Sequence, residues 1–342
     1  PDDYEKIQWA VDNASAGDTI IVRDGTYYEN VFVDKQLTIK SENGSDNCIV
    51  DGTGSIVFTL EADGIRIEGF SITGGSYGIY ICSNNNMIIN NIITNNYDGI
   101  DLWSSNNNSI SNNNISSNNW LGIWLGYSND NIISNNEFIN DGLFVYDSYG
   151  NIVEDNTVNG KPLVYLEGES DEFIDNAGQV ILVRCRNISV MNAEIKNTDV
   201  GIELWQSDNC SILNNNISSN NRDGIWLYGS NNNSISNNII SNNVDGIDLS
   251  YSNNNSISNN NISSKNWYGI YLWYSNENSI SDNIIRSNYR GIYLWYSNNI
   301  IYLNNFINNT YNARSYNSKN IWNTTEQITY VYKGSTFTNY LG

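Results

Sequence analysis

The sequence predicts an all-β solenoid, in which short parallel strands joined by polar turns form successive coils. The first observation behind this prediction is a glycine that returns every 22 or 23 residues, as at Gly224, Gly246 and Gly269. A constant period of this size is typical of repeat architectures. Further copies of the repeat begin at Gly99, Gly122, Gly201 and Gly291.

The second observation is the phase of the apolar residues within the repeat. Counting from Gly246, position one is Ile247 and position three is Leu249, and isoleucine or phenylalanine recurs at positions eleven and sixteen, here Ile257 and Ile262. Residues two apart lie on one face of a strand. A single coil cannot bury these side chains, whereas stacked coils can, at roughly 1.5–3 kcal/mol for each buried aliphatic. We therefore expect them to share one interior, with positions two and four pointing outward.

The third observation is a set of polar positions that keep the same phase. Position six is serine, as at Ser252, and position fourteen is asparagine, from Asn113 through Asn260 to Asn305 in the last regular copy. Stacked asparagine side chains can hydrogen-bond from coil to coil, and asparagine tolerates the left-handed backbone of a tight corner. These residues are predicted to be structural.

The composition limits the classes of function. The chain has 342 residues and a net charge of −21, which argues against nucleic acid or an anionic membrane surface as a partner. No transmembrane run is evident, so we do not expect an integral membrane protein, and a mature secreted chain fits. The 4 cysteines form no CxxC pair, which favours buried thiols over a zinc site.

We predict one domain over residues 1–342 with about twelve coils. Its parts are an N-terminal helical cap (1–18), irregular coils (19–77), regular repeats (78–141), enlarged coils with an acidic loop (142–200), regular repeats (201–310) and a C-terminal cap formed by a β-hairpin (311–342). No cofactor or metal is expected, and the alternative is calcium at the acidic loop, residues 167–172.

The opening segment, residues 7–27, resembles the start of pectin-lyase-like right-handed parallel β-helix proteins. The Gly-Ile-x-Leu repeats with their Ser-Asn and Ile-Ser-Asn-Asn turns resemble the NosD-like, or CASH (carbohydrate-binding and sugar hydrolase), repeat family. Residues 159–165 and 178–183 are similar to archaeal, especially methanogen, surface proteins of that family. The resemblance implies a right-handed β-helix but does not select a function, because this fold hosts many activities.

Aromatic and acidic residues gather at the outward positions of the repeat. The candidate residues for binding a ligand or partner are Trp103, Trp124, Trp205, Trp226, Tyr228, Tyr271, Trp273, Tyr293, Trp295, Asp98, Asp101, Glu203, Asp245 and Asp248. Three interpretations compete. The aromatic rings stiffen the stack of coils, or they form a protein–protein seam, or they make a platform for sugar rings with the carboxylates accepting sugar hydroxyls.

Catalysis has less support in the sequence. The chain has no histidine, which removes the commonest general base. Paired carboxylates could still hydrolyse a glycoside, and the best pairs are Asp245 with Asp248 and Asp98 with Asp101. Both pairs are expected on an open strand, with nothing to exclude water or raise a pKa. No catalytic residue is therefore assigned.

These observations favour an extracellular structural protein of the cell envelope, such as a surface-layer, sheath or fibre subunit. It would associate with itself or with other envelope proteins through an exposed aromatic and acidic face. The alternatives are a carbohydrate-binding module or adhesin that uses the same face to bind polysaccharide, and a polysaccharide hydrolase or lyase.

Overall fold

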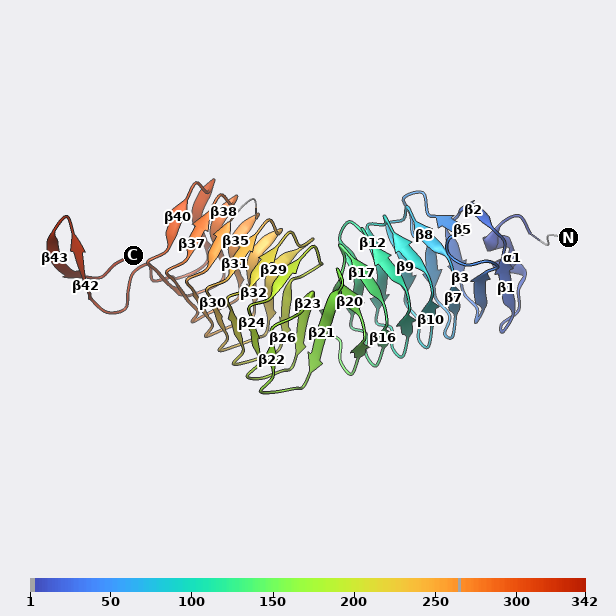
Figure 1. The fold of residues 1–342 in the computed structure, drawn as a ribbon, viewed down its shortest axis with the longest axis horizontal. Helices are drawn as coiled ribbons and strands as arrows, with labels where there is room; N and C mark the ends of the chain where they lie inside the picture. The colour runs from blue at the N-terminus through green and yellow to red at the C-terminus, as the bar shows by residue number, and fades with distance from the viewer. Residues whose placement is uncertain (1–3, 264–265) are drawn as a thin grey trace. The chain divides into compact units, whose positions relative to one another are not determined.

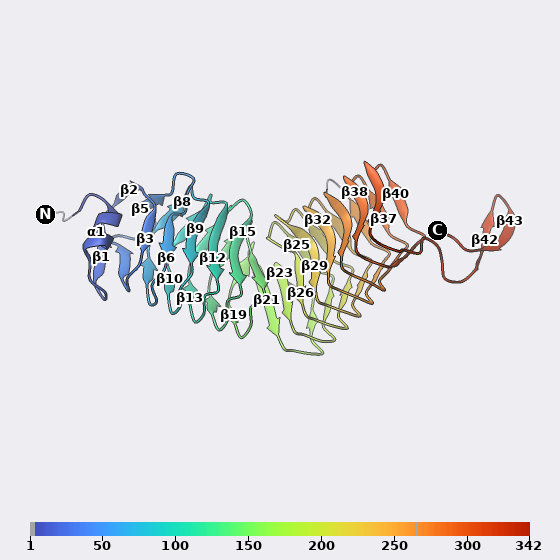
Figure 2. The same cartoon turned by 180° about the vertical axis from the view of Figure 1, so that it is seen from behind.

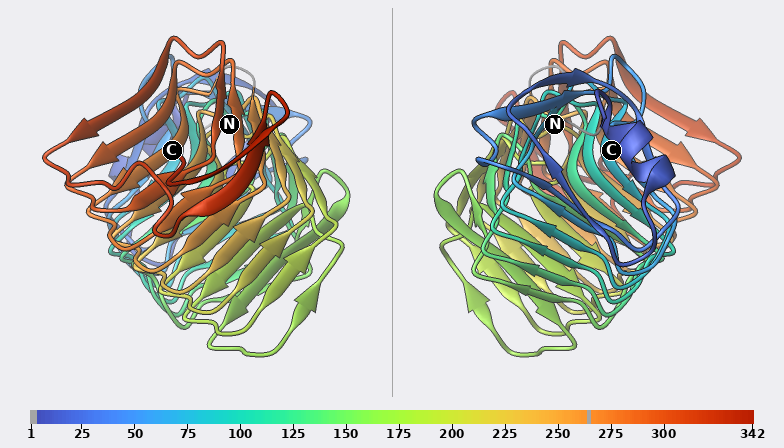
Figure 3. Two further views of the ribbon diagram at one scale, coloured as in Figure 1. Left: turned by 90° about the vertical axis from the view of Figure 1, so that its left-hand side faces the viewer. Right: turned by 90° about the vertical axis from the view of Figure 1, so that its right-hand side faces the viewer.

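The computed structural model describes residues 4–263 and 266–342, and it is a β-solenoid of about 13 turns (Figures 1 and 2). Its contacts divide the chain into two compact units. Unit 1 comprises Pro1–Tyr165 with Asn197–Asp199, and unit 2 comprises Leu166–Lys196 with Val200–Gly342. In each unit the strands of successive coils stack in register, which is evident in the view along the coils (Figure 3). That the whole chain is a single domain stays a prediction.

Unit 1 begins with the predicted helix, α1 (Ile7–Asn13). Ile7 and Val11, four residues apart, are buried, so one face of the helix covers the first coil. The carboxylate of Glu29 accepts hydrogen bonds from the N–H groups of Ile7 and Gln8 at 3.0 and 3.1 Å. At the other end, Lys35 Nζ donates to the carbonyl oxygens of residues 11, 12 and 14. The negative charge of Glu29 at the start of the helix and the positive charge of Lys35 at its end both interact favourably with the helix dipole.

Three parallel sheets form the walls of unit 1. The first contains β1 (Thr19–Val22), β4 (Thr38–Ser41), β7 (Arg66–Glu68), β10 (Met87–Ile89), β13 (Ser109–Ser111), β16 (Ile132–Ser134) and β19 (Ile152–Glu154). The second contains β2 (Gly25–Tyr28), β5 (Cys48–Asp51), β8 (Ser71–Thr73), β11 (Ile92–Thr94), β14 (Asn114–Ser116), β17 (Glu137–Ile139) and β20 (Thr157–Val158). The third contains β3 (Val31–Val33), β6 (Phe58–Leu60), β9 (Tyr77–Ile81), β12 (Asp98–Trp103), β15 (Leu121–Gly126) and β18 (Leu143–Tyr146). One antiparallel pair interrupts this pattern, where β21 (Lys161–Glu167) turns back on β20.

Unit 2 repeats the same plan. One sheet contains β23 (Gln179–Val183), β26 (Ile202–Trp205), β29 (Asp223–Tyr228), β32 (Asp245–Ser250), β35 (Tyr268–Trp273), β38 (Arg290–Trp295) and β41 (Tyr311–Tyr316). Another contains β22 (Phe173–Ile174), β24 (Ser189–Met191), β27 (Ser211–Leu213), β30 (Ser234–Ser236), β33 (Ser256–Ser258), β36 (Ser279–Ser281) and β39 (Ile300–Tyr302). The last contains β25 (Glu194–Lys196), β28 (Asn216–Ser218), β31 (Ile239–Ser241), β34 (Asn261–Ser263), β37 (Ile284–Arg286) and β40 (Asn305–Ile307).

The predicted C-terminal hairpin is confirmed, with β42 (Ile328–Tyr332) antiparallel to β43 (Ser335–Asn339). The chain after it returns to Thr324, whose backbone N–H donates to the carbonyl of Leu341 at 2.8 Å. Val331 and Phe337 of the hairpin are exposed. That the hairpin acts as a cap stays a prediction.

The predicted interior is confirmed. Positions one and three of the repeat are fully buried, as in Ile247 and Leu249, and so are the residues at positions eleven and sixteen, Ile257 and Ile262. The glycine that marks each copy is explained by the stacking. A Cβ on Gly224 would lie 2.7 Å from the carbonyl oxygen of the glycine in the next coil, which leaves no room for any side chain there.

The asparagine ladder is also confirmed. Asn260 Nδ2 donates to Asn283 Oδ1 at 3.0 Å and to the carbonyl oxygens of residues 235 and 258, while its Oδ1 accepts from Asn238. One member was predicted wrongly. The ladder ends at Asn304, which accepts from Asn283, and Asn305 is exposed on β40. The last coil is one residue shorter at this point, because the ladder step from Asn283 to Asn304 spans 21 residues.

Candidate binding face

The fourteen candidate residues lie on the outward side of the glycine-led strands, but they do not form one exposed face. Only Trp103 and Trp295 are exposed, at 41% and 37%. The half-buried members are Trp124, Tyr228, Asp245, Tyr271 and Trp273. The buried members are Asp98, Asp101, Glu203, Trp205, Trp226, Asp248 and Tyr293. The prediction of an exposed acidic and aromatic face is therefore wrong for most of these residues, and their part in binding stays a prediction.

The burial of the acidic residues comes from the coils on either side. Asp248 is in register with Trp226 below and Tyr271 above. Neighbouring parallel strands are about 4.8 Å apart, so two large rings overhang the short side chain between them. Asp101 lies in the same way between Tyr80 and Trp124.

Unit 2 brings two of these carboxylates, Asp245 and Asp248, together with a third that was not among the candidates, Asp223. Oxygens of Asp223, Asp245 and Asp248 lie within 4.8 Å of one another. Burial raises the pKa of Asp245 to about 8 and that of Asp223 to about 6, and it raises the pKa of Asp248 well above its usual value. The guanidinium of Arg222, with Nε at 3.3 Å from Asp223 Oδ2, partly opposes this effect. The expectation that nothing at this strand raises a pKa is thus wrong, because the flanking rings remove water from the carboxylates.

Unit 1 holds a smaller group. Burial raises the pKa of Asp98 to about 6 and that of Asp101 to about 7. Asp98 accepts a hydrogen bond from the N–H of Leu121 at 3.0 Å. Asp101 Oδ1 is buried and has no hydrogen-bond donor among the described residues. An acid with a pKa of about 7, such as Asp101, is partly protonated at neutral pH.

Three exposed tyrosines of unit 2 lie one position further along the repeat than the last of the candidate positions. Tyr251, Tyr274 and Tyr296 occupy position five in consecutive coils and are 41%, 41% and 40% exposed. Successive rings are parallel, with centroids 5.5 and 5.0 Å apart and interplanar angles of 6° and 2°. We call these three residues the tyrosine row. Our sequence analysis missed it, although the signal was present as a tyrosine five residues after each of three successive glycines.

The backbone of the tyrosine row is unusual. All three residues have positive φ, at 51°, 48° and 50°. This left-handed region is uncommon for residues other than glycine and asparagine, and a bulky side chain there is strained. Unit 1 has one residue of this kind, Tyr127, whose ring contacts Trp103 and Tyr146 edge-on rather than in a parallel stack.

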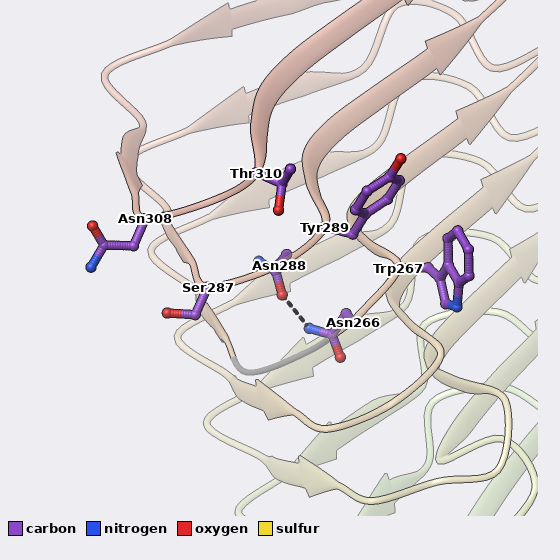
Figure 4. Close-up of a pocket in the computed structure, with 7 residues that line it drawn as sticks. All are labelled: Asn266, Trp267, Ser287, Asn288, Tyr289, Asn308 and Thr310. Carbon is purple, nitrogen blue, oxygen red and sulfur yellow. Dashed lines mark hydrogen bonds between the residues drawn. The ribbon is translucent and has the colours of Figure 1, made fainter.

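A second group of exposed rings borders a shallow pocket in unit 2. Trp267 and Tyr289 are exposed and meet edge to face, with centroids 5.3 Å apart at 72°. The pocket has a volume of about 400 Å³. It is lined by Asn266, Trp267, Ser287, Asn288, Tyr289, Asn308 and Thr310 (Figure 4). Asn266 Nδ2 donates to Asn288 Oδ1 at 2.8 Å across its floor, so the lining is neutral and amide-rich.

Comparison with known proteins identifies the family. The family model described as "Periplasmic copper-binding protein (NosD)" matches residues 11–176 and 160–342, nearly the whole chain. The chain belongs to the NosD family. This NosD-family chain is also 38% identical over 102 residues to a cell surface glycoprotein of Methanothermus fervidus. That match covers 28% of the chain and only 17% of the relative's length. Both matches agree with the predicted extracellular or cell-surface location.

Solved structures resemble the chain at low similarity only. The alginate lyase from a Paenibacillus species has a TM-score of 0.33 and 16% identity, over 89% of this chain and 95% of the lyase. The Dettilon tailspike protein has a TM-score of 0.38 and 15% identity, over 79% of this chain and 58% of the tailspike. Likenesses of this size carry no argument about activity. Among the described residues, no helix is long and apolar enough to cross a membrane.

The three carboxylates that this NosD-family chain brings together do not fit copper. Copper sites in proteins use imidazole, thiolate or thioether ligands. The chain has no histidine. In the described part of the chain, the one group of three metal-ligating side chains is the Asp223, Asp245 and Asp248 cluster, which offers oxygen alone. Oxygen donors suit harder ions such as magnesium or calcium.

Proposed function

We propose that this NosD-family chain is a structural protein of the cell envelope that associates with further copies of itself through the tyrosine row. The observation that carries the proposal is the placement of three exposed, parallel tyrosines at left-handed corners of consecutive coils. Each strained corner costs about 1–3 kcal/mol. A ring–ring contact returns only about 0.5–1.5 kcal/mol. Asparagine would occupy the same corners with less strain, so stability alone does not account for the rings.

The ring geometry favours a protein partner over a sugar. Within the tyrosine row the ring faces are turned toward one another, so the edges and hydroxyl groups face solvent. A sugar stacks on a ring face, whereas edges and hydroxyls suit interdigitation with aromatic side chains of another protein surface. Trp273 and Trp295 flank the row and contact Tyr274 and Tyr296, which widens the aromatic strip.

The charge distribution favours a second copy as that partner. The chain carries a net charge of −21, so two copies repel over most of their surface. The strip formed by residues 250–251, 273–274 and 295–296 contains serine, tyrosine and tryptophan only. Two copies can therefore approach there with the least repulsion, and added salt should help them to do so.

Sedimentation velocity over a range of protein and salt concentrations tests the proposal. The wild-type chain is expected to associate more strongly as either concentration rises. A variant with Tyr251→Asn, Tyr274→Asn and Tyr296→Asn should stay monomeric, because asparagine keeps the left-handed corners but removes the rings. The matched control is Tyr127→Asn in unit 1, which should associate like the wild type. A wild-type chain that remains monomeric throughout, or a triple variant that still associates, would refute the proposal.

The pocket beside Trp267 favours a second candidate function, the binding of a neutral polysaccharide. Trp267 and Tyr289 meet at a steep angle, which leaves ring surface open, and the amides around them can pair with sugar hydroxyls. Calorimetric titration with envelope polysaccharide should show binding that Trp267→Ala abolishes. The matched control, Trp103→Ala on an exposed tryptophan of unit 1, should leave it intact. Equal binding by the two variants would count against this site.

A further inference from the structure

We infer that unit 2 carries a row of N-glycosylation sites at one corner of its coils, formed by Asn209, Asn232 and Asn254. Each begins an Asn-x-Ser sequence, with Ser211, Ser234 and Ser256 two residues later. This inference is independent of the proposed self-association.

The three asparagines hold equivalent places in consecutive coils. The backbone N–H of each donates to a carbonyl oxygen of the next coil at 3.1 Å, so the three corners stack directly on one another. Their φ angles are 58°, 59° and 58°. The serines are in register as well, with Ser211 paired to Ser234 and Ser234 paired to Ser256. Three complete acceptor sequences are therefore presented in the same conformation.

Burial separates these asparagines from those that build the ladders. Asn209, Asn232 and Asn254 are exposed, and their side-chain amides have no hydrogen-bond partner among the described residues. Asn233, the residue after Asn232, is buried, and its Nδ2 donates to the carbonyl of Ser207 at 3.0 Å. The same repeat thus contains asparagines committed to the fold and asparagines whose amides are available to an enzyme.

Three other sequons are less available than these corners. Asn187, one coil earlier at the same corner, donates its amide to Asp171 Oδ1 at 3.2 Å. Asn114 is half-buried on β14 and donates to Glu137. Asn261 is half-buried on β34. The amides of Asn209, Asn232 and Asn254 are therefore preferred as acceptors over these three.

The reaction requires a lipid-linked oligosaccharide donor and a transferase. The amide nitrogen of the asparagine forms a bond to the anomeric carbon of the first sugar. The bond from that carbon to the lipid phosphate oxygen breaks, the phosphate leaves with the bonding electron pair, and the amide loses one proton. The product is an asparagine-linked glycan on the outer surface of the coil.

The spacing of the row predicts which glycans can coexist. Neighbouring coils are about 4.8 Å apart, and a pyranose with its hydroxyl groups is at least as wide as that separation. Glycans on adjacent corners would therefore crowd each other. We expect chains that carry glycans on Asn209 and Asn254 together, or on Asn232 alone, and few chains with all three.

Glycopeptide mass spectrometry of the full chain, isolated from its native cell surface, tests this inference. Modified peptides containing Asn209, Asn232 or Asn254 are expected, at higher occupancy than those containing Asn114 or Asn261. Native chains in which all three corner asparagines are unmodified, or in which the half-buried sequons are preferred, would overturn the proposal.

A pair of variants at one serine makes the test independent of folding. Ser234→Ala removes the acceptor sequence of Asn232 without altering the corner, and it should abolish the glycan there and raise joint occupancy of Asn209 and Asn254. Ser234→Thr retains the acceptor sequence and should preserve the wild-type pattern. A glycan on Asn232 in the alanine variant would contradict the proposed row. Three glycans on most wild-type chains would contradict the spacing rule.

Discussion

The two units have the same kind of interior but differ along the outward edge of their glycine-led strands. At position five, unit 1 has Ser104 in one coil and Tyr127 in the next, and the ring of Tyr127 meets Trp103 and Tyr146 edge-on. Unit 2 places tyrosine there in three successive coils, and the rings stack in parallel. In both units the buried apolar positions of the repeat carry mostly aliphatic residues. The stack of coils therefore fixes the direction of each side chain and leaves the chemistry of the outer edge free to vary from one coil to the next.

The buried acids show the same contrast. Unit 1 pairs Asp98 with Asp101, whereas unit 2 brings three carboxylates together beside one arginine. In each unit one of the acids, Asp101 or Asp248, lies between rings of the two adjacent coils. The difference lies in how many coils in a row carry an acid at the outward positions.

The largest expected effect is the loss of stability when a ladder asparagine is replaced, and it tests whether the ladder stabilises the two units equally. Asn113 in unit 1 and Asn260 in unit 2 each donate Nδ2 to two backbone carbonyls and to the next ladder asparagine. Replacing either by alanine leaves several buried polar groups without partners, at about 1–3 kcal/mol for each group. Both variants should lower the free energy of unfolding by several kcal/mol, measured by denaturant titration.

The control for this comparison is Asn254→Asp, on an exposed corner whose side-chain amide has no partner among the described residues. It should change the unfolding free energy by less than about 0.5 kcal/mol, as surface substitutions usually do. A clear difference between Asn113→Ala and Asn260→Ala would show that the shared ladder does not stabilise the two units equally.

The sequence was sufficient to predict the interior because the interior depends on period and phase alone. Ile247, Leu249 and Asn260 lie where the repeat places them. The exposure of a side chain on the outer edge depends on residues of the adjacent coils, which lie one period away in the chain. Asp101 is outward, as predicted, yet only 2% exposed, because the rings of the flanking coils overhang it. To predict the exposure of a short side chain on a stacked coil, one must therefore know which residues of the two adjacent coils are in register with it. A single repeat does not contain this information.

The smaller expected effect is a change of stability with pH caused by the buried acids, and its pH range differs between the units. The pKa of an aspartate in the unfolded chain is about 3.9. Burial raises the pKa of Asp101 to about 7 and that of Asp245 to about 8. Between the unfolded and folded pKa values the native state binds more protons than the unfolded state, so the free energy of unfolding falls as pH rises. The melting temperature should therefore decline from about pH 4 to pH 7 through Asp101, and up to pH 8 through Asp245.

Amide variants separate these two windows. Asp101→Asn and Asp245→Asn should match the wild type near pH 4, where the native acids are neutral, and should each be more stable than it at pH 8.5 by about 1–3 kcal/mol. The gain should be complete by pH 7 for Asp101→Asn and should continue to rise to pH 8 for Asp245→Asn.

Glu68→Gln is the control of opposite sign, because a hydrogen bond from Arg66 lowers the pKa of Glu68. It should lose less than about 1 kcal/mol above pH 5 and nothing in acid. If both aspartate variants instead lose stability at pH 8.5, the flanking rings do not keep water from the carboxylates, and the proposed origin of their raised pKa values is wrong.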